Sequence, residues 1–196
     1  MKSKIYKEKY SKKTSKKKVK EKRYVDVKWI LIISLVSFLI SFFFSLFSEI
    51  IIPNTTLIIS IFSLFIFIFL GILFDMIGIS VTVSDIKTFN SMASKQVRGA
   101  NLAVKFIKNS EKVSSFCNDV IGDICGIVSG GAGVSIAHSI SNTFDVPFLY
   151  CTLLITSIIA SLTIGGKAIG KSFAINKSNV ILYRFVSILS FFYRKK

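Results

Sequence analysis

Long apolar runs alternate with short polar segments along this chain. Two of the runs, 29–52 and 57–83, are almost uninterrupted, and each contains a single acidic residue, Glu49 and Asp75 respectively. A helix needs about 20 predominantly apolar residues to cross a membrane, and both runs are long enough. The pattern therefore predicts two membrane-spanning helices joined by a tight turn at Pro53.

The third and fourth apolar runs differ from each other in composition. Residues 113–139 mix polar side chains with many small residues, as in "GIVSGGAG", whereas residues 147–165 are mostly apolar. Small residues allow close helix packing, and polar residues within a membrane normally face the interior of a bundle. We therefore predict two more spans, the third of which packs closely against a helix of the same chain or of a second copy.

Two polar segments carry apolar residues at helical spacing. Residues 84–112 contain six Lys and Arg, and the apolar positions among them are Val97, Ala100, Ala103, Val104 and Ile107. This pattern is typical of a helix that lies against a membrane surface. Residues 178–193 are amphipathic as well. The predicted fold is an all-α integral membrane protein with about four transmembrane helices, a cytoplasmic amphipathic elbow over 84–112 and a juxtamembrane helix over 178–193.

Lys and Arg are confined to three segments of the chain. Of the 26 in total, 13 lie within residues 1–28, six within 84–112 and seven after residue 165, while the turns at 53–56 and 140–146 hold none. Short loops rich in Lys and Arg stay on the cytoplasmic side of a membrane. The distribution predicts a cell-membrane protein whose two termini are both cytoplasmic.

The first 28 residues form a low-complexity, Lys-rich tail. Such a block repels itself and is expected to be disordered. Its expected partner is anionic lipid of the bilayer, because each Lys or Arg near the surface contributes about 1 kcal/mol. No aromatic platform accompanies the lysines, so a nucleic-acid partner is not expected. The domain plan is a tail over 1–28, an extra first helix over 29–52 and a transmembrane domain over 53–196.

The stretch "GGKAIGKS" at 165–172 matches the phosphate-loop pattern G-x-x-x-x-G-K-[ST]. That loop works between a strand and a helix, where backbone amides surround the phosphates. Here the stretch follows a predicted membrane span, and 24 residues come after it. We therefore expect no bound nucleotide.

The cysteines and the single histidine do not form the pattern of a catalytic or metal site. Cys117, Cys125 and Cys151 form no C-x-x-C pair and lie in apolar stretches, so we expect small buried side chains. His138 lies near the outer end of the third span and is expected in the membrane interface. The sequence shows neither a nucleophile beside a base nor His/Cys metal spacing, and this argues against an enzyme.

Three stretches from about Gly71 onward resemble one known membrane family. "GISVTVSD" ends a span in small and hydroxyl residues, "RGANLAVKFIKNSEKVSSF" resembles an elbow leading into "VIGDICGI", and "IGGKAIGKSFAINKSNVI" resembles the end of a last span. The family is CNNM/CorB, implicated in magnesium and cobalt transport, and about 120 of the 196 residues resemble its transmembrane domain. The resemblance implies Mg²⁺ held by oxygen ligands at the membrane midplane, and a homodimer. The family's cytoplasmic CBS pair has no counterpart in these residues.

Oxygen-bearing side chains in the second and third spans are the candidate ion ligands. Asp119 and Asp123 are four residues apart and therefore share one helix face. The rest of the candidate site consists of Asp75, Ser80, Ser84, Asn118 and Gly122. An all-oxygen set suits a hard cation such as Mg²⁺, and an acid inside a membrane indicates a functional site. Asp119 and Asp123 are the predicted metal ligands.

The last family motif departs from its usual pattern. The family's acidic position falls on Lys167 and its proline on Gly170, within an altered motif that also includes Gly166 and Lys171. An ammonium at residue 167 places a fixed cation where a divalent ion should bind. Two interpretations stay open: a divalent-cation transporter or ion-binding protein, and a non-transporting membrane adaptor in which a pair between Asp123 and Lys167 replaces the ion.

Overall fold

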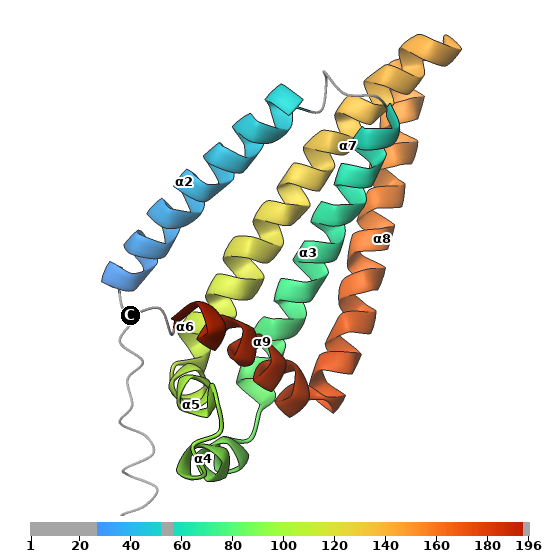
Figure 1. Ribbon diagram of the computed structural model, residues 1–196. Helices are drawn as coiled ribbons and strands as arrows, with labels where there is room; N and C mark the ends of the chain where they lie inside the picture. Colours follow the sequence, from blue (N-terminus) through green and yellow to red (C-terminus); the bar gives the residue numbers. More distant parts are fainter. Residues whose placement is uncertain (1–26, 52–56, 194–196) are drawn as a thin grey trace, which may run out of the picture. The chain divides into compact units, whose positions relative to one another are not determined.

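The computed structural model describes residues 27–51 and 57–193, and it is helical almost throughout these two ranges, with no strand in either (Figure 1). The helical segments are α2 (Val27–Ile51), α3 (Leu57–Val83), α4 (Ile86–Ser94), α5 (Ala100–Lys108), α6 (Ser110–Ser115), the π-helical η2 (Phe116–Gly122), α7 (Asp123–Phe144), α8 (Phe148–Asn176) and α9 (Ser178–Tyr193). Nearly all of the Lys-rich tail and the turn at 53–56 lie outside the described residues.

Four helical runs are long and apolar enough to cross a membrane: Val27–Leu46, Leu57–Val83, Ser110–Phe144 and Phe148–Asn176. This confirms an all-α membrane protein with the four predicted spans. The second span has the bounds that the sequence predicted. The fourth helix continues to Asn176, well past the predicted end at residue 165, so the basic residues there are helical.

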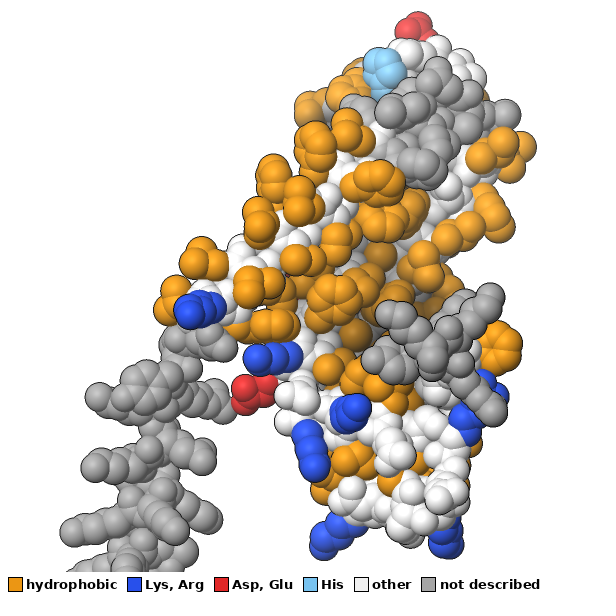
Figure 2. Space-filling model, turned by 60° about the vertical axis from the view of Figure 1, so that its left-hand side comes forward, with side chains coloured by type: hydrophobic (Ala, Val, Ile, Leu, Met, Phe, Trp, Pro, Cys, Tyr) orange, Lys and Arg blue, Asp and Glu red, His pale blue; other side chains and the backbone are white. Residues whose placement is uncertain are grey.

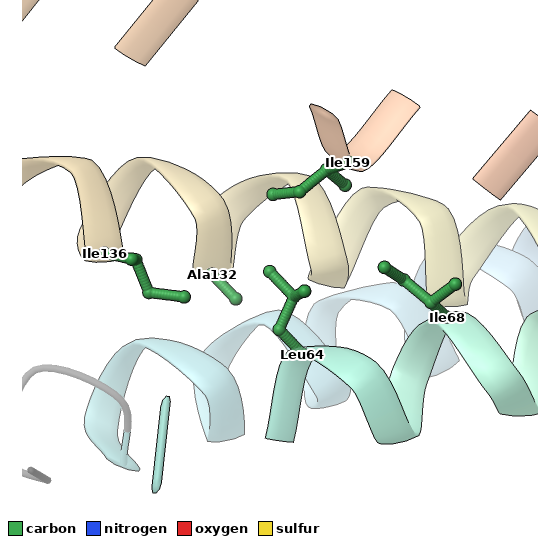
Figure 3. Close-up of a cluster of buried hydrophobic side chains, with 5 residues drawn as sticks. All are labelled: Leu64, Ile68, Ala132, Ile136 and Ile159. Carbon is green, nitrogen blue, oxygen red and sulfur yellow. The ribbon is translucent and has the colours of Figure 1, made fainter. Parts of the chain in front are cut away.

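Helices α3, α7 and α8 lie side by side, and α7 runs opposite to the other two (Figure 1). Their shared core consists of Leu64, Ile68, Ala132, Ile136 and Ile159 (Figure 3). Gly133 of α7 faces α8, where an added Cβ atom would overlap the end of the Ile159 side chain. Small residues of the third span therefore allow α7 to pack closely on α8 of the same chain.

A second layer of helices packs on the end of α3. Its core consists of Val81, Phe89, Ala103, Leu182 and Val186, each at most 1% exposed. These residues come from α3, α4, α5 and α9. The elbow and the last helix, which are distant in the sequence, therefore share one apolar core with the end of a membrane span.

The elbow differs from the helix that the sequence predicted along a membrane surface. It is divided into α4, α5 and α6, and the chain turns between α4 and α5, where Gln96 and Gly99 have φ angles of 55° and 80°. Ala100 and Ala103 are fully buried. The apolar face of α5 thus packs on protein, because α3 and α9 offer it an apolar surface.

Helix α9 presents apolar side chains in two directions. Leu182 and Val186 are buried in the second layer, whereas Val180, Ile188 and Phe191 are 51%, 62% and 68% exposed. A helix that is apolar on both sides needs an apolar environment on its outer side too. This arrangement fits the predicted juxtamembrane helix.

Candidate functional site

Five charged side chains gather where α3, η2, α7 and α8 run together. Asp75 lies on α3, Asp119 on η2, Asp123 at the start of α7, and Lys167 and Lys171 on α8. The Lys167 ammonium lies 3.9 Å from the Asp123 carboxylate, measured from Nζ to Oδ1. Asp75 interacts electrostatically with the other four. We call this group the charged cluster.

Two glycines lie where α3 meets the junction of η2 and α7, next to the Lys167 ammonium. A Cβ atom on Gly122 would lie 3.7 Å from Lys167 Nζ and 3.5 Å from the Cys117 carbonyl oxygen. A Cβ atom on Gly71 of α3 would lie 3.1 Å from Cys125 Cβ and 3.6 Å from the Gly122 carbonyl oxygen. Because Gly71 has no side chain, α3 approaches the junction of η2 and α7 closely, and the Lys167 ammonium reaches this junction from α8.

The third span contains a π-helical turn, η2, which was not predicted from the sequence. Single π-turns inside helices occur frequently at functional sites. Asp119 within η2 and Asp123 just after it are both exposed, whereas Cys117 and Val120 are buried. The two predicted metal ligands therefore remain on the same exposed side of the span.

Helix lengths indicate the depth of the charged cluster. With a rise of about 1.5 Å per residue, Asp75 lies about 27 Å along α3 from Leu57, and Lys167 lies about 29 Å along α8 from Phe148. The hydrocarbon core of a bilayer is about 30 Å thick. If the turn between α7 and α8 marks one membrane boundary, the cluster falls near the other one. This differs from the midplane site that the family resemblance implies.

The uncharged candidate ligands lie at two separate places, Asn118 at one and the two serines, Ser80 and Ser84, at the other. Asn118 lies against Gly78 of α3, where an added Cβ would overlap its side-chain amide. Ser80 follows Gly78 by two residues, which turns it about 200° around the helix axis. Ser84 lies one turn beyond Ser80, and its N–H donates to the Ser80 carbonyl at 3.0 Å. The structure therefore does not bring the two serines together with Asn118.

Three of these predicted ligands carry buried oxygen atoms without a hydrogen-bond partner among the described residues: Asn118 Oδ1, Ser80 Oγ and Ser84 Oγ. The Asn118 Nδ2 amide donates to Ser114 Oγ at 3.4 Å. Unpaired buried oxygens are unusual and call for an explanation. Because they face different sides of α3, they do not form one coordination shell.

The stretch that matches a phosphate loop is part of helix α8. Its residues 165–172 lie inside Phe148–Asn176, so their backbone does not form an anion-binding loop. Gly166 and Gly170 face α3 instead. A Cβ atom on Gly170 would lie 2.9 Å from Met76 Cγ and 3.1 Å from Ile72 Cγ2, and one on Gly166 would overlap Ile72. The two glycines allow close packing of α8 on α3, as in other small-x-x-x-small helix pairs.

The charged cluster contains two ammoniums as well as carboxylates, so its composition differs from an all-oxygen set. Mg²⁺ takes near-octahedral oxygen coordination. Within 27–51 and 57–193, no group of three or more His, Cys, Asp and Glu side chains is arranged to hold a metal. The Lys167 ammonium is the cation that lies beside Asp123.

The remaining residues singled out from the sequence lie away from the charged cluster or contribute apolar surface to it. Cys117 and Cys125 are buried free thiols, and Cys151 is half-buried. His138 is exposed, its Nε2 lies 3.3 Å from Asn142 Nδ2, and its ring packs edge-on against Phe148. Its place fits the expected interfacial residue.

Sequence reasoning overlooked Gly71 and Gly78, which bring α3 close to η2 and α7. A signal was present, because the two glycines are seven residues apart and therefore lie on one face of α3.

Comparison with models of protein families, with curated proteins and with solved structures finds no match to this chain.

Proposed function

We propose that this protein is a non-transporting, multi-pass membrane scaffold in which Lys167 acts as a tethered cation. The observation that carries the proposal is the 3.9 Å distance between Lys167 Nζ and Asp123 Oδ1. A lysine ammonium bears a fixed positive charge and offers no lone pair to a metal. It therefore neutralises the carboxylates and repels a divalent ion at the same place.

The energy of this ion pair is small by itself. The Asp123 side chain is 67% exposed and that of Lys167 is 28% exposed. Pairs of this kind contribute roughly 0–1 kcal/mol. The role of Lys167 is therefore to balance charge where α3, η2, α7 and α8 meet near a membrane boundary.

The orientation belongs to the same proposal. Between Lys112 and Lys167 the chain has no Lys or Arg, and this stretch includes the turn between α7 and α8. Lys and Arg side chains gather around the end that carries α4 and α5 (Figure 2). By the positive-inside rule this end faces the cytoplasm, with both termini on that side. The Lys-rich tail then contacts anionic lipid, and a homodimer is the assembly that the family resemblance suggests.

A second candidate is a divalent-cation protein of the CNNM/CorB type, carrying Mg²⁺ or Co²⁺. It is favoured by the convergence of Asp75, Asp119 and Asp123 from three helical segments. On this view Lys167 would have to leave the carboxylates before an ion could bind.

Isothermal titration of Mg²⁺ and Co²⁺ into the detergent-purified protein separates the two candidates. We expect no saturable binding to the unaltered protein. Asp123→Asn and Lys167→Met should each lower the free energy of unfolding slightly, and the pair should show a coupling of at most about 1 kcal/mol in a double-mutant cycle.

The matched control is Asp145→Asn, which removes a carboxylate at the opposite end of α7. Asn tolerates the left-handed backbone found there, where φ is 54°. Saturable Mg²⁺ binding that disappears in Asp123→Asn but persists in Asp145→Asn would contradict the scaffold and establish the second candidate.

A further inference from the structure

An open surface cavity of about 500 Å³ lies between the start of α5 and the end of α9. Its polar lining consists of Gln96, Arg98, Asn101, Lys105 and Ser190. None of the described residues that line it is acidic. The cavity is separate from the charged cluster, with which it shares no residue. Its side chains can donate several hydrogen bonds to an anion.

The two cations of this cavity are well suited to a phosphate group. A guanidinium presents its N–H groups in a fixed fork that matches phosphate oxygens, and an ammonium adds a point charge. The Arg98 guanidinium lies over the Phe191 ring, with Cζ 5.5 Å from the ring centroid. This contact restrains Arg98 beside the cavity before any ligand binds.

The backbone at the start of α5 adds a smaller positive potential to that of the two side chains. Helix α5 spans nine residues, and its N-cap is Gly99, which has no side chain to cap the first turn. The positive end of the helix dipole therefore points at the region lined by Arg98 and Asn101. Anions are stabilised at such helix ends.

The depth of the cavity identifies the source of the phosphate. The core of the second layer joins Ala103 of α5 to Val81 of α3. Val81 lies about 36 Å along α3 from Leu57. Measured from a hydrocarbon edge at Leu57, this is about 6 Å beyond the far edge of a core about 30 Å thick, within a headgroup layer about 5–8 Å deep. Exposed Ile188 and Phe191 flank Ser190 on α9 and offer apolar contact to acyl chains. A phosphate at this depth belongs to a lipid.

We propose that this cavity binds the phosphodiester headgroup of an anionic phospholipid. Arg98 and Lys105 hold the phosphate oxygens, and Gln96, Asn101 and Ser190 donate or accept hydrogen bonds around them. The site stands whichever of the two functions above is correct, because none of its residues belongs to the charged cluster.

The test titrates short-chain dihexanoyl-phosphatidylglycerol into the full-length protein in neutral detergent and measures binding by thermophoresis. The Arg98→Gln/Lys105→Gln double variant should bind this lipid at least about tenfold more weakly, since it removes both charge-assisted contacts to the phosphate. The control is Lys95→Gln/Lys108→Gln, which removes the same charge from exposed positions of the elbow outside the cavity. It should change the affinity less than about twofold.

Three results would overturn the proposal. Equal losses in both double variants would mean that only overall charge attracts the lipid. Equal affinity for dihexanoyl-phosphatidylcholine would show that the anionic headgroup is not selected. Competition by inorganic phosphate at the same concentration as the lipid would assign the cavity to a soluble anion. If the double variant fails to fold by circular dichroism, Lys105→Gln alone against Lys108→Gln repeats the comparison.

Discussion

Lys167 is the residue on which the character of the charged cluster depends. Its ammonium lies 3.9 Å from the Asp123 carboxylate and beside Gly122, where an added Cβ atom would be in van der Waals contact with it. With three carboxylates and two ammoniums, the cluster has a formal charge of −1. A Lys167→Glu change would make that charge −3, which would favour binding of a divalent cation. One side chain thus separates a cluster of charge −1 from one of charge −3.

Asp85 allows a prediction at the residue scale that concerns pH. Its carboxylate accepts hydrogen bonds from the Lys87 N–H and the Thr88 hydroxyl, both at 3.0 Å, and caps α4. These bonds hold the pKa of Asp85 below its usual 3.8, the Lys87 N–H contributing most. A lowered pKa adds stability above about pH 4, which is lost as the pH falls through the native pKa.

We therefore expect the unaltered protein to lose more thermal stability between pH 6 and pH 3 than an Asp85→Asn variant, because Asn caps the helix without titrating. Melting curves by circular dichroism at the two pH values give the change in melting temperature of each protein, and the two changes are then compared. Identical losses in the two proteins would contradict the role of the cap.

At the scale of elements, the close approach of α3 and α8 explains why α8 continues past residue 165. Gly166 and Gly170 face Ile72 and Met76, so the last turns of α8 keep an apolar neighbour even where lysines begin. Lys167 on the same helix lies 3.9 Å from Asp123, and Lys171 interacts electrostatically with Asp75. A helix whose basic side chains have partners need not end where the apolar sequence ends.

Gly170→Leu should weaken the packing of α8 on α3. An added Cβ would already lie 2.9 Å from Met76 Cγ, and a full leucine must displace Met76 and Ile72. Overpacking of this kind costs about 1–3 kcal/mol. Unfolding of the detergent-purified protein in rising fractions of sodium dodecyl sulfate should show the loss.

The matched control for that experiment is Gly165→Leu, because nothing lies within 4 Å of a Cβ atom at Gly165. Both changes raise helix propensity by the same amount, so their difference isolates packing. If the two variants unfold alike, then Gly170 does not serve the contact between α3 and α8.

At the scale of the molecule, the described part from α3 onward combines two kinds of core. The bundle of α3, α7 and α8 buries a strip of aliphatic side chains and leaves large apolar residues exposed outside, as lipid-facing helices do. The second layer has a core of its own around Phe89 and a cation-rich exterior. A single membrane boundary between the two layers places the apolar exterior of the bundle in lipid and the cation-rich exterior of the second layer outside it.

The orientation that follows is testable by cysteine accessibility. In a protein whose Cys117, Cys125 and Cys151 are replaced by alanine, Asn90→Cys on α4 should react with a membrane-impermeant maleimide only after cells are opened. Asp145→Cys at the other end should react in intact cells. The reverse pattern would place α4 and α5 outside the cell and refute the proposed topology.

Several features of this protein follow from its sequence without a structure. Runs of about 20 apolar residues have few alternatives to membrane helices, since backbone polar groups must be satisfied internally in lipid. For that reason the four spans and the all-α class were predictable, and α3 has the predicted bounds. The amphipathic character of the elbow and of residues 178–193 was also readable from residue spacing.

Only the tertiary structure decided which polar residues meet. Asp75, Asp119, Asp123 and Lys167 come together where α3, η2, α7 and α8 meet, and Gly71 allows α3 to approach closely there, whereas Ser80 and Ser84 face another side of α3. The direction in which a side chain points within the bundle depends on the rotation of its helix and on the π-turn of η2. Neither can be read from the pattern of apolar residues in the sequence. The burial of Ala100 and Ala103 on protein was decided in the same way, because only the fold brings α9 to the elbow.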